Sequence, residues 1–137
     1  MATIELRHAH SLETEEARRR SRALVDQFAD KLKAAVLGEP QNIDNRWQLA
    51  QTYMKVSAYP QAVSELQAIV RISPDNLRAL QLLGQAAARM DNWELAANTW
   101  QKAFQVSPDD TGKQGLFEAR LKLYQDKKPF HAANSQE

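Results

Sequence analysis

One pattern is written twice in the middle of the chain. Residues 46–79 read RWQLAQTYMKVSAYPQAVSELQAIVRISPDNLRA, and residues 80–108 read LQLLGQAAARMDNWELAANTWQKAFQVSP. When the second stretch is laid on the first, apolar, small, aromatic and proline positions recur at a spacing of 34 residues. A third proline, Pro40, stands 34 residues before Pro74. Self-similarity at a period of this length is typical of stacked helical repeats, in which each unit buries its apolar face against the next.

The spacing of apolar residues predicts two helices in each copy. The expected helices cover residues 43–56, 60–72, 77–89 and 93–106. Pro60 fits a first helical turn, because its missing N–H is not needed there. Small residues allow the two helices of a copy to approach closely, and we expect Ala50 and Ala62 in the first copy, and Gly84 and Ala96 in the second, to be the close-contact positions.

The order Leu49-Ala50-x2-Tyr53, then Ala62-x3-Leu66, then Pro74 resembles the tetratricopeptide repeat (TPR) family. The resemblance implies an all-α helix-turn-helix solenoid with two full repeats, at 43–76 and 77–110. It also implies a non-catalytic protein–protein interaction module, such as an adaptor, co-chaperone or assembly factor. Such a module holds a short peptide or a partner helix on its concave face, which is lined by the first helix of each repeat.

An N-terminal helix is expected over residues 11–38, capped by Ser11 or Thr14 and ended by Gly38 and Pro40. Since Pro40 keeps the repeat spacing, this helix would act as the second half of a degenerate preceding repeat and cover the first full one. Its apolar stripe is Leu24, Val25, Phe28, Leu32, Ala35 and Val36. Residues 1–10 alternate apolar and polar side chains, so we expect a mobile, extended segment there.

A capping helix is expected over residues 111–126, begun by Asp109 or Thr111. We expect its stripe of Phe117, Leu121 and Tyr124 to close the end of the second repeat. Residues 127–137 have no periodicity, and we expect them to be disordered.

Composition argues against chemistry in this chain. The 18 basic and 17 acidic residues give a net charge of +1, and there is no cysteine for a disulfide, a thiolate zinc site or a nucleophile. His8, His10 and His131 lie near the termini without a third metal ligand, and no glycine-rich loop resembles a phosphate site. We therefore expect no enzyme activity, no cofactor, no metal and no small-molecule substrate. Because no apolar run suits a signal or a membrane span, we expect a cytoplasmic protein without membrane contact.

The candidate site is the concave groove of the two repeats. Side chains three and four residues apart on each first helix, out of phase with the core, would line it. They are Asp44, Trp47, Gln48, Gln51, Met54, Lys55, Arg78, Gln81, Gln85 and Arg89. An indole beside basic side chains favours a peptide with an apolar anchor and an acidic residue or free C-terminal carboxylate. The alternative for Trp47 is a position beneath the N-terminal helix.

In the family, chaperone-binding members hold a C-terminal carboxylate with lysine and asparagine on successive first helices. At the corresponding positions this chain has Trp47 and Gln51 in the first repeat and Gln81 and Gln85 in the second. The resemblance therefore does not extend to that clamp.

Two other functions stay open: nucleic-acid binding through the basic cluster Arg18–Arg22, and self-association, giving a homo-oligomer, through the N-terminal helix. The glutamates around that cluster neutralise it, which disfavours nucleic acid.

Overall fold

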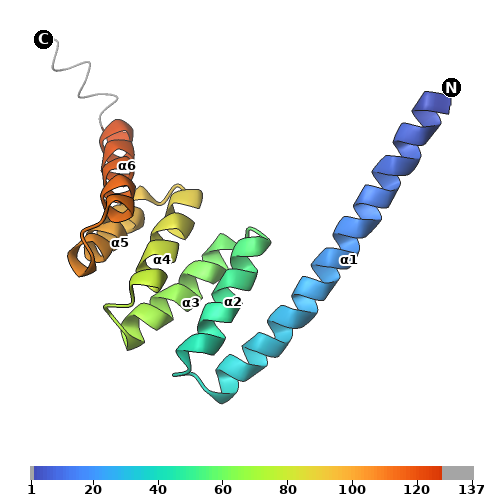
Figure 1. The fold of residues 1–137 in the computed structure, drawn as a ribbon. Coiled ribbons are helices and arrows are strands. Elements are labelled where there is room, and N and C mark those ends of the chain that lie inside the picture. Colours follow the sequence, from blue (N-terminus) through green and yellow to red (C-terminus); the bar gives the residue numbers. More distant parts are fainter. Residues whose placement is uncertain (1, 128–137) are drawn as a thin grey trace, which may run out of the picture.

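The computed structural model describes residues 2–127, and the side chains of residues 14–126 within them. This part of the chain forms six helices and no strand. Figure 1 shows how these helices are arranged in space. The helices are α1 (Ala2–Gly38), α2 (Ile43–Lys55), α3 (Tyr59–Ile72), α4 (Leu77–Arg89), α5 (Trp93–Val106) and α6 (Asp110–Lys127). Each helix packs against the next along the chain. The all-α solenoid expected from the 34-residue period is confirmed.

The first helix of each repeat starts at an asparagine cap. The Asn42 Oδ1 accepts a hydrogen bond from the Asn45 N–H at 3.1 Å, and the Asn76 Oδ1 does the same for Ala79 at 3.1 Å. The turns inside the repeats also match, since Ser57 and Asp91 adopt positive φ angles of 58° and 56°. Such left-handed residues are uncommon outside glycine. Their recurrence sets the same reversal of the chain in both repeats.

The core follows the stacking of the helices in two buried clusters. The first joins α2, α3 and α4 through Ala50, Val63, Leu66, Ile69, Ala79, Leu83 and Ala86. The second joins α4, α5 and α6 through Leu80, Ala87, Ala96, Ala97, Trp100, Ala103 and Ala119. Because α4 contributes to both, the two repeats share one continuous core.

An ion pair bridges the helices of the first repeat. The Arg46 Nη1 lies 2.9 Å from the Glu65 Oε2, and both side chains are more than four-fifths buried, with 18% and 17% exposed. The Arg46 Nε also donates to the Pro40 carbonyl at 2.7 Å. One guanidinium therefore ties the segment before α2 to α3.

A large aromatic ring lies between the helices of the second repeat, where the first repeat has Leu66. The Trp100 indole lies against Gly84, where an added Cβ would come within 2.5 Å of its Nε1, and against Gly115, where a Cβ would overlap the ring. Gly84 and Ala96, the predicted close-contact positions, are both buried, and the side chain that lies against Gly84 is Trp100. Two glycines on different helices thus form the slot for one buried indole, which is 5% exposed.

The start of α1 corrects the expectation of an extended segment. Residues 2–10 are helical, and Ser11 and Thr14 lie inside the helix instead of capping it. No glycine or proline interrupts residues 2–37, and adding a residue to an existing helix costs much less than starting one. Figure 1 shows the first half of α1 running away from the repeats.

The second half of α1 covers the first repeat, as expected. Ala29, Leu32 and Val36 are buried against Leu49 of α2, with Tyr53 beside them. Leu24 and Phe28, which were expected in the same stripe, are 66% and 51% exposed. They lie on a neighbouring face of the helix, away from the contact with α2.

The apolar face expected to cap the second repeat points outward. Phe117, Leu121 and Tyr124 are 69%, 43% and 56% exposed, whereas Ala119 is buried. The cap explains the error: Asp109 Oδ1 accepts from the Gly112 N–H at 2.8 Å, one residue earlier than the repeat spacing from Asn42 and Asn76 requires. One residue turns a helix by about 100°, since 3.6 residues make a turn. The face of α6 that carries Gly115 therefore packs against Trp100.

Candidate functional site

The residues predicted to line the groove lie on α2 and α4, mostly in contact with solvent. Seven are exposed: Asp44, Gln48, Gln51, Lys55, Arg78, Gln85 and Arg89. Three are half-buried: Trp47, Met54 and Gln81. None is fully buried, so all ten have part of their surface available to a ligand.

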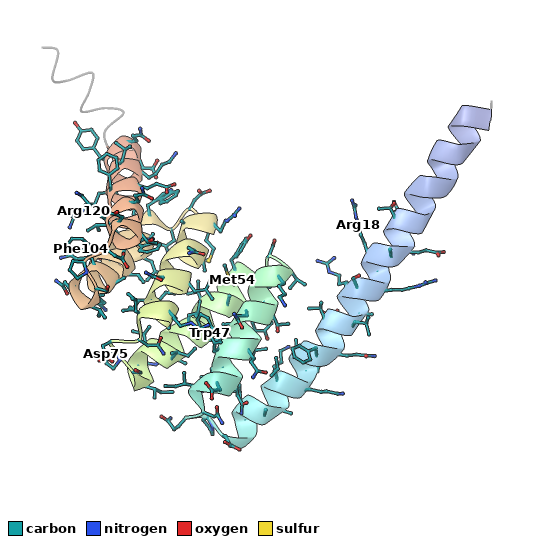
Figure 2. The ribbon with its side chains drawn as sticks, in the orientation of Figure 1. Arg18, Trp47, Met54, Asp75, Phe104 and Arg120 are labelled. Atoms are coloured by element: carbon teal, nitrogen blue, oxygen red, sulfur yellow. The ribbon has the colours of Figure 1, made fainter. Side chains whose placement is uncertain are left out.

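Trp47 and Arg78 form the centre of this surface. The Arg78 guanidinium carbon lies 4.8 Å from the centroid of the Trp47 ring, within the range of a cation–π contact. Trp47 and Met54 pack against the first core cluster, which includes Ala79 of α4, and Figure 2 shows both side chains on the body of the repeats. One edge of the indole is thus held by the core while a cation covers its face.

The alternative position for Trp47, beneath the N-terminal helix, does not occur. The cluster between α1 and α2 consists of Ala29, Leu32, Val36 and Leu49, with Tyr53 packed beside it. Trp47 packs instead against the cluster shared by α2, α3 and α4. It therefore belongs to the side of α2 that faces the next repeat.

One residue of the groove was missed by the sequence analysis. Leu82 is half-buried against the same cluster as Trp47 and stands one helical turn after Arg78. Arg78, Leu82, Gln85 and Arg89 follow the spacing of one helix face. This spacing was the signal in the sequence that could have identified Leu82.

The far end of the groove differs from the expectation. The 34-residue spacing from Gln81 and Gln85 predicts Gly115 and Ala119 on the groove, where small residues would leave it open. Instead, Gly115 lies against Trp100 and Ala119 is 1% exposed. Counting from the cap at Asp109, the places of Gln81 and Gln85 are taken in α6 by Gln114 and Glu118, which are exposed. The α6 end of the groove thus presents an amide and a carboxylate.

Lys55 contributes to a different hollow as well. A space of about 510 Å³ between the middle of α1 and the end of α2 is lined by Thr14, Ala17, Arg18, Ser21, Arg22, Val25, Lys55 and Val56. Figure 2 shows Arg18 on α1 above this space. Arg18 and Arg22 belong to the basic cluster, so only part of that cluster faces the repeats.

Within the same cluster, Arg20 is paired in a way the sequence predicted. Its Nη2 lies 3.7 Å from the Glu16 Oε2, four residues earlier, and both side chains are exposed. A surface pair of this kind contributes about 0.3–0.5 kcal/mol to a helix. It also lowers the charge that the cluster presents to a polyanion.

No metal arrangement accompanies the groove in the described residues. No group of three or more His, Asp or Glu side chains is placed there to hold a metal ion. His8, His10 and His131 lie outside the side chains that the structure describes. Over the same part of the chain, no helix is both long and apolar enough to cross a membrane.

Neither a protein-family model nor a curated protein sequence matches the chain. Several solved structures, however, match the chain in fold. "MamA MSR-1 C2" superposes with a TM-score of 0.64 at 22% identity, over 80% of this chain and 62% of that one. The chain therefore spans less than two-thirds of that protein's length.

Two further structures have the TPR in their description. The first TPR of Spaghetti (RPAP3) bound to the HSP90 peptide SRMEEVD gives a TM-score of 0.65 at 16% identity, over 75% of this chain and 82% of that one. The Sgt2 TPR domain from Aspergillus fumigatus gives 0.65 at 19% identity, over 84% and 78%. With the 34-residue period and the paired helices, these likenesses show that the chain has the fold of a TPR solenoid.

Proposed function

We propose that the protein is a non-catalytic interaction module that holds a short peptide or a partner helix in the groove formed by α2 and α4. The observation that carries the proposal is the half-buried Trp47 beneath the Arg78 guanidinium, at 4.8 Å. The repeat does not need an indole there, because the equivalent position of the second repeat is Gln81. A large aromatic side chain at an interface, supported on one edge, is the usual form of a binding hot spot.

The charges around Trp47 indicate the chemistry of the ligand. Arg78 and Arg89 stand on one face of α4, and a carboxylate can accept paired hydrogen bonds from a guanidinium. An apolar side chain of the ligand would lie on the indole while a nearby acidic residue or C-terminal carboxylate engages Arg78. The exposed amides of Gln51 and Gln85 offer donors and acceptors for the ligand backbone.

The comparison with RPAP3 supports a peptide ligand, since that TPR is described as bound to an HSP90 peptide with an acidic end, SRMEEVD. The ligand of this chain would be held differently, because Trp47, Gln51, Gln81 and Gln85 stand in place of the lysine–asparagine clamp. An adaptor, co-chaperone or assembly factor that selects an apolar-acidic segment fits this groove.

The test begins with selection of peptides from a displayed random library on the full-length chain. The Kd of a selected peptide is then measured by fluorescence anisotropy. Trp47→Ala should weaken binding by about 30- to 1,000-fold, the effect of about 2–4 kcal/mol at a hot spot. Trp93→Ala is the matched control, because it removes a half-buried indole from the start of α5, outside the groove. Equal losses in both variants, or none in Trp47→Ala, would exclude the groove.

The charge of the groove is tested with Arg78→Glu against the exposed Arg71→Glu on α3. Only the first should weaken peptide binding, and raising the salt concentration should do so modestly. Nucleic-acid binding would behave differently, because phosphate contacts give a steep linear fall of log affinity with log salt. Steep salt dependence that disappears when Arg18, Arg19 and Arg22 are replaced would favour that alternative.

A further inference from the structure

The end of the solenoid carries an apolar face that the groove does not use. Phe117 and Leu121 of α6 are 69% and 43% exposed. They border a hollow of about 450 Å³ lined by Phe104, Lys113, Leu116, Phe117, Arg120 and Leu121. Figure 2 shows Phe104 and Arg120 together at this end of the molecule. The face combines apolar side chains with two cations.

The internal repeat shows what covers such a face. α6 begins at an Asp109 cap as α4 begins at an Asn76 cap, so Lys113 and Leu116 stand where Leu80 and Leu83 stand in α4. Phe104 lies 34 residues after Val70. Val70, Leu80 and Leu83 also line a hollow, and its other side is formed by Leu95, Asn98 and Thr99 of α5. In the described part of the chain, α6 is therefore a first helix without its second.

The first repeat indicates the charge of the missing helix. Arg46 is the fourth residue after its cap, and its Nη1 is 2.9 Å from the Glu65 Oε2 on the second helix. The fourth residue after the cap of α6 is Lys113, again a cation. Arg120 adds a second positive charge on the same hollow. A helix seated there would place an acidic side chain where α3 has Glu65.

Steric fit restricts the occupant further. In α4 the eighth residue after the cap is Gly84, and it admits the bulky Trp100 of the covering helix. In α6 the eighth residue is Phe117, so the covering helix must have a smaller side chain than tryptophan at that point. In α3 the residue that corresponds to Trp100 is Leu66. A helix that covers α6 should therefore resemble α3 more than α5 at this position.

We propose that the Phe117–Leu121 face of α6 is a second docking site, separate from the groove, for an acidic amphipathic helix of a partner protein. The helix would complete a third repeat: its apolar stripe covers Phe117 and Leu121, and its carboxylate pairs with Lys113 and Arg120. Continuity with the stacked helices of the core, together with the charge of the hollow, supports this occupant over a neutral or basic helix.

The probe is a synthetic peptide with the sequence of α3, residues 59–72, acetylated and amidated at its ends. It is added to the full-length, ¹⁵N-labelled chain, and amide shifts are followed by NMR. The peptide should shift amides of residues 113–124 selectively, and the same peptide with Glu65→Lys should bind at least about tenfold more weakly. The α5 peptide, residues 93–106, is the matched control and should give no saturable shifts. It has Thr99 where α3 has the acidic Glu65, and the bulky Trp100 where α3 has Leu66.

A charge exchange makes the test specific. Lys113 is exposed, so Lys113→Glu leaves the core intact; it should weaken binding of the α3 peptide and restore binding of the Glu65→Lys peptide. Phe117→Ser should abolish binding of both. The proposal is overturned if the three peptides bind alike, or if none binds at millimolar concentration.

The same spectra would also reveal two other occupants of the α6 face, and finding either of them would overturn the proposal. Shifts at residues 113–124 that grow with protein concentration without peptide would identify a second copy of this chain. Shifts at these residues on removal of residues 128–137 would identify the chain's own end. Competition by a groove-binding peptide would show that the two sites are one, whereas loss of the α6 site alone leaves the proposed groove function intact.

Discussion

The two repeats solve the same packing problem with different residues. At the contact between the paired helices the first repeat has Ala50 and Leu66, both fully buried, and the second has Gly84 and the much larger Trp100. One side chain becomes smaller as the other becomes larger, which keeps the total volume between the helices within what close packing tolerates. Because the two size changes balance each other, we attribute this difference between the repeats to packing of the fold.

Other differences between the repeats are not compensated. Trp47 in the first repeat corresponds to Gln81 in the second, and Asp44 corresponds to Arg78. None of these side chains is fully buried, so the core does not require any of them. Positions that differ between the repeats without a compensating change in a packing partner are therefore the positions that are available for binding a ligand.

The largest effect on stability is expected at the Gly84–Trp100 contact. Gly84→Leu should lower the free energy of unfolding by about 3 kcal/mol or more, because a Cβ alone would lie 2.5 Å from the indole Nε1. Urea denaturation measures the change. Gly38→Leu is the matched control, since no atom lies within 4 Å of a Cβ there. A Gly84→Leu chain as stable as the wild type would show that the repeats are misaligned.

A double-mutant cycle sharpens the comparison at the same contact. Gly84→Ala with Trp100→Leu gives the second repeat the pair found in the first, Ala50 and Leu66. The two changes should be less destabilising together than the sum of the single changes, with a coupling of about 1–2 kcal/mol. Recovery should be partial, because Gly115 also faces the lost indole. Strict additivity would contradict compensation between the two positions.

An effect smaller than that of Gly84→Leu is expected at the Arg46–Glu65 pair, which corresponds to Leu80 and Thr99 in the second repeat. Glu65→Ala should cost about 1–3 kcal/mol, because it leaves a guanidinium more than four-fifths buried without its carboxylate. Replacing both residues, Arg46→Leu with Glu65→Thr, should cost less than Glu65→Ala alone. Thermal unfolding compares the two chains. A double variant that is the less stable of the two would show that the ion pair stabilises the repeat beyond its packing.

The 34-residue period was enough to predict the fold and the helices of the two repeats, because apolar spacing, caps and prolines agree there. It was not enough for α6. Asp109, one of the two predicted caps, does cap α6, but it lies one residue before position 110, which the 34-residue spacing from Asn76 gives. This one-residue shift turns the helix by about 100°, which carries Phe117, Leu121 and Tyr124 away from the second repeat. Only the size of Trp100, which needs Gly115 beside it, would have shown which face is buried.

The groove could be predicted in part. Side chains out of phase with the core on α2 and α4 were identified from spacing alone, and their exposure follows from the helix geometry. The contact between Trp47 and Arg78 could not be predicted, since it joins residues 31 positions apart whose distance depends on how α2 and α4 pack. Leu82 was missed because exposure of an apolar residue in a repeat depends on the same packing.

The central claim is that Trp47 is in the first repeat for binding and not for folding. Its most direct test is Trp47→Gln, which installs the residue of the second repeat, with the Kd of a library-selected peptide and the free energy of unfolding measured on the same preparation. We expect the Kd to rise about 30-fold or more. We expect the free energy of unfolding to fall by about 1–2 kcal/mol at most, because part of the indole is exposed and the stem of the glutamine keeps part of the packing against the core. An unchanged Kd, or a chain destabilised by several kcal/mol, would contradict the claim.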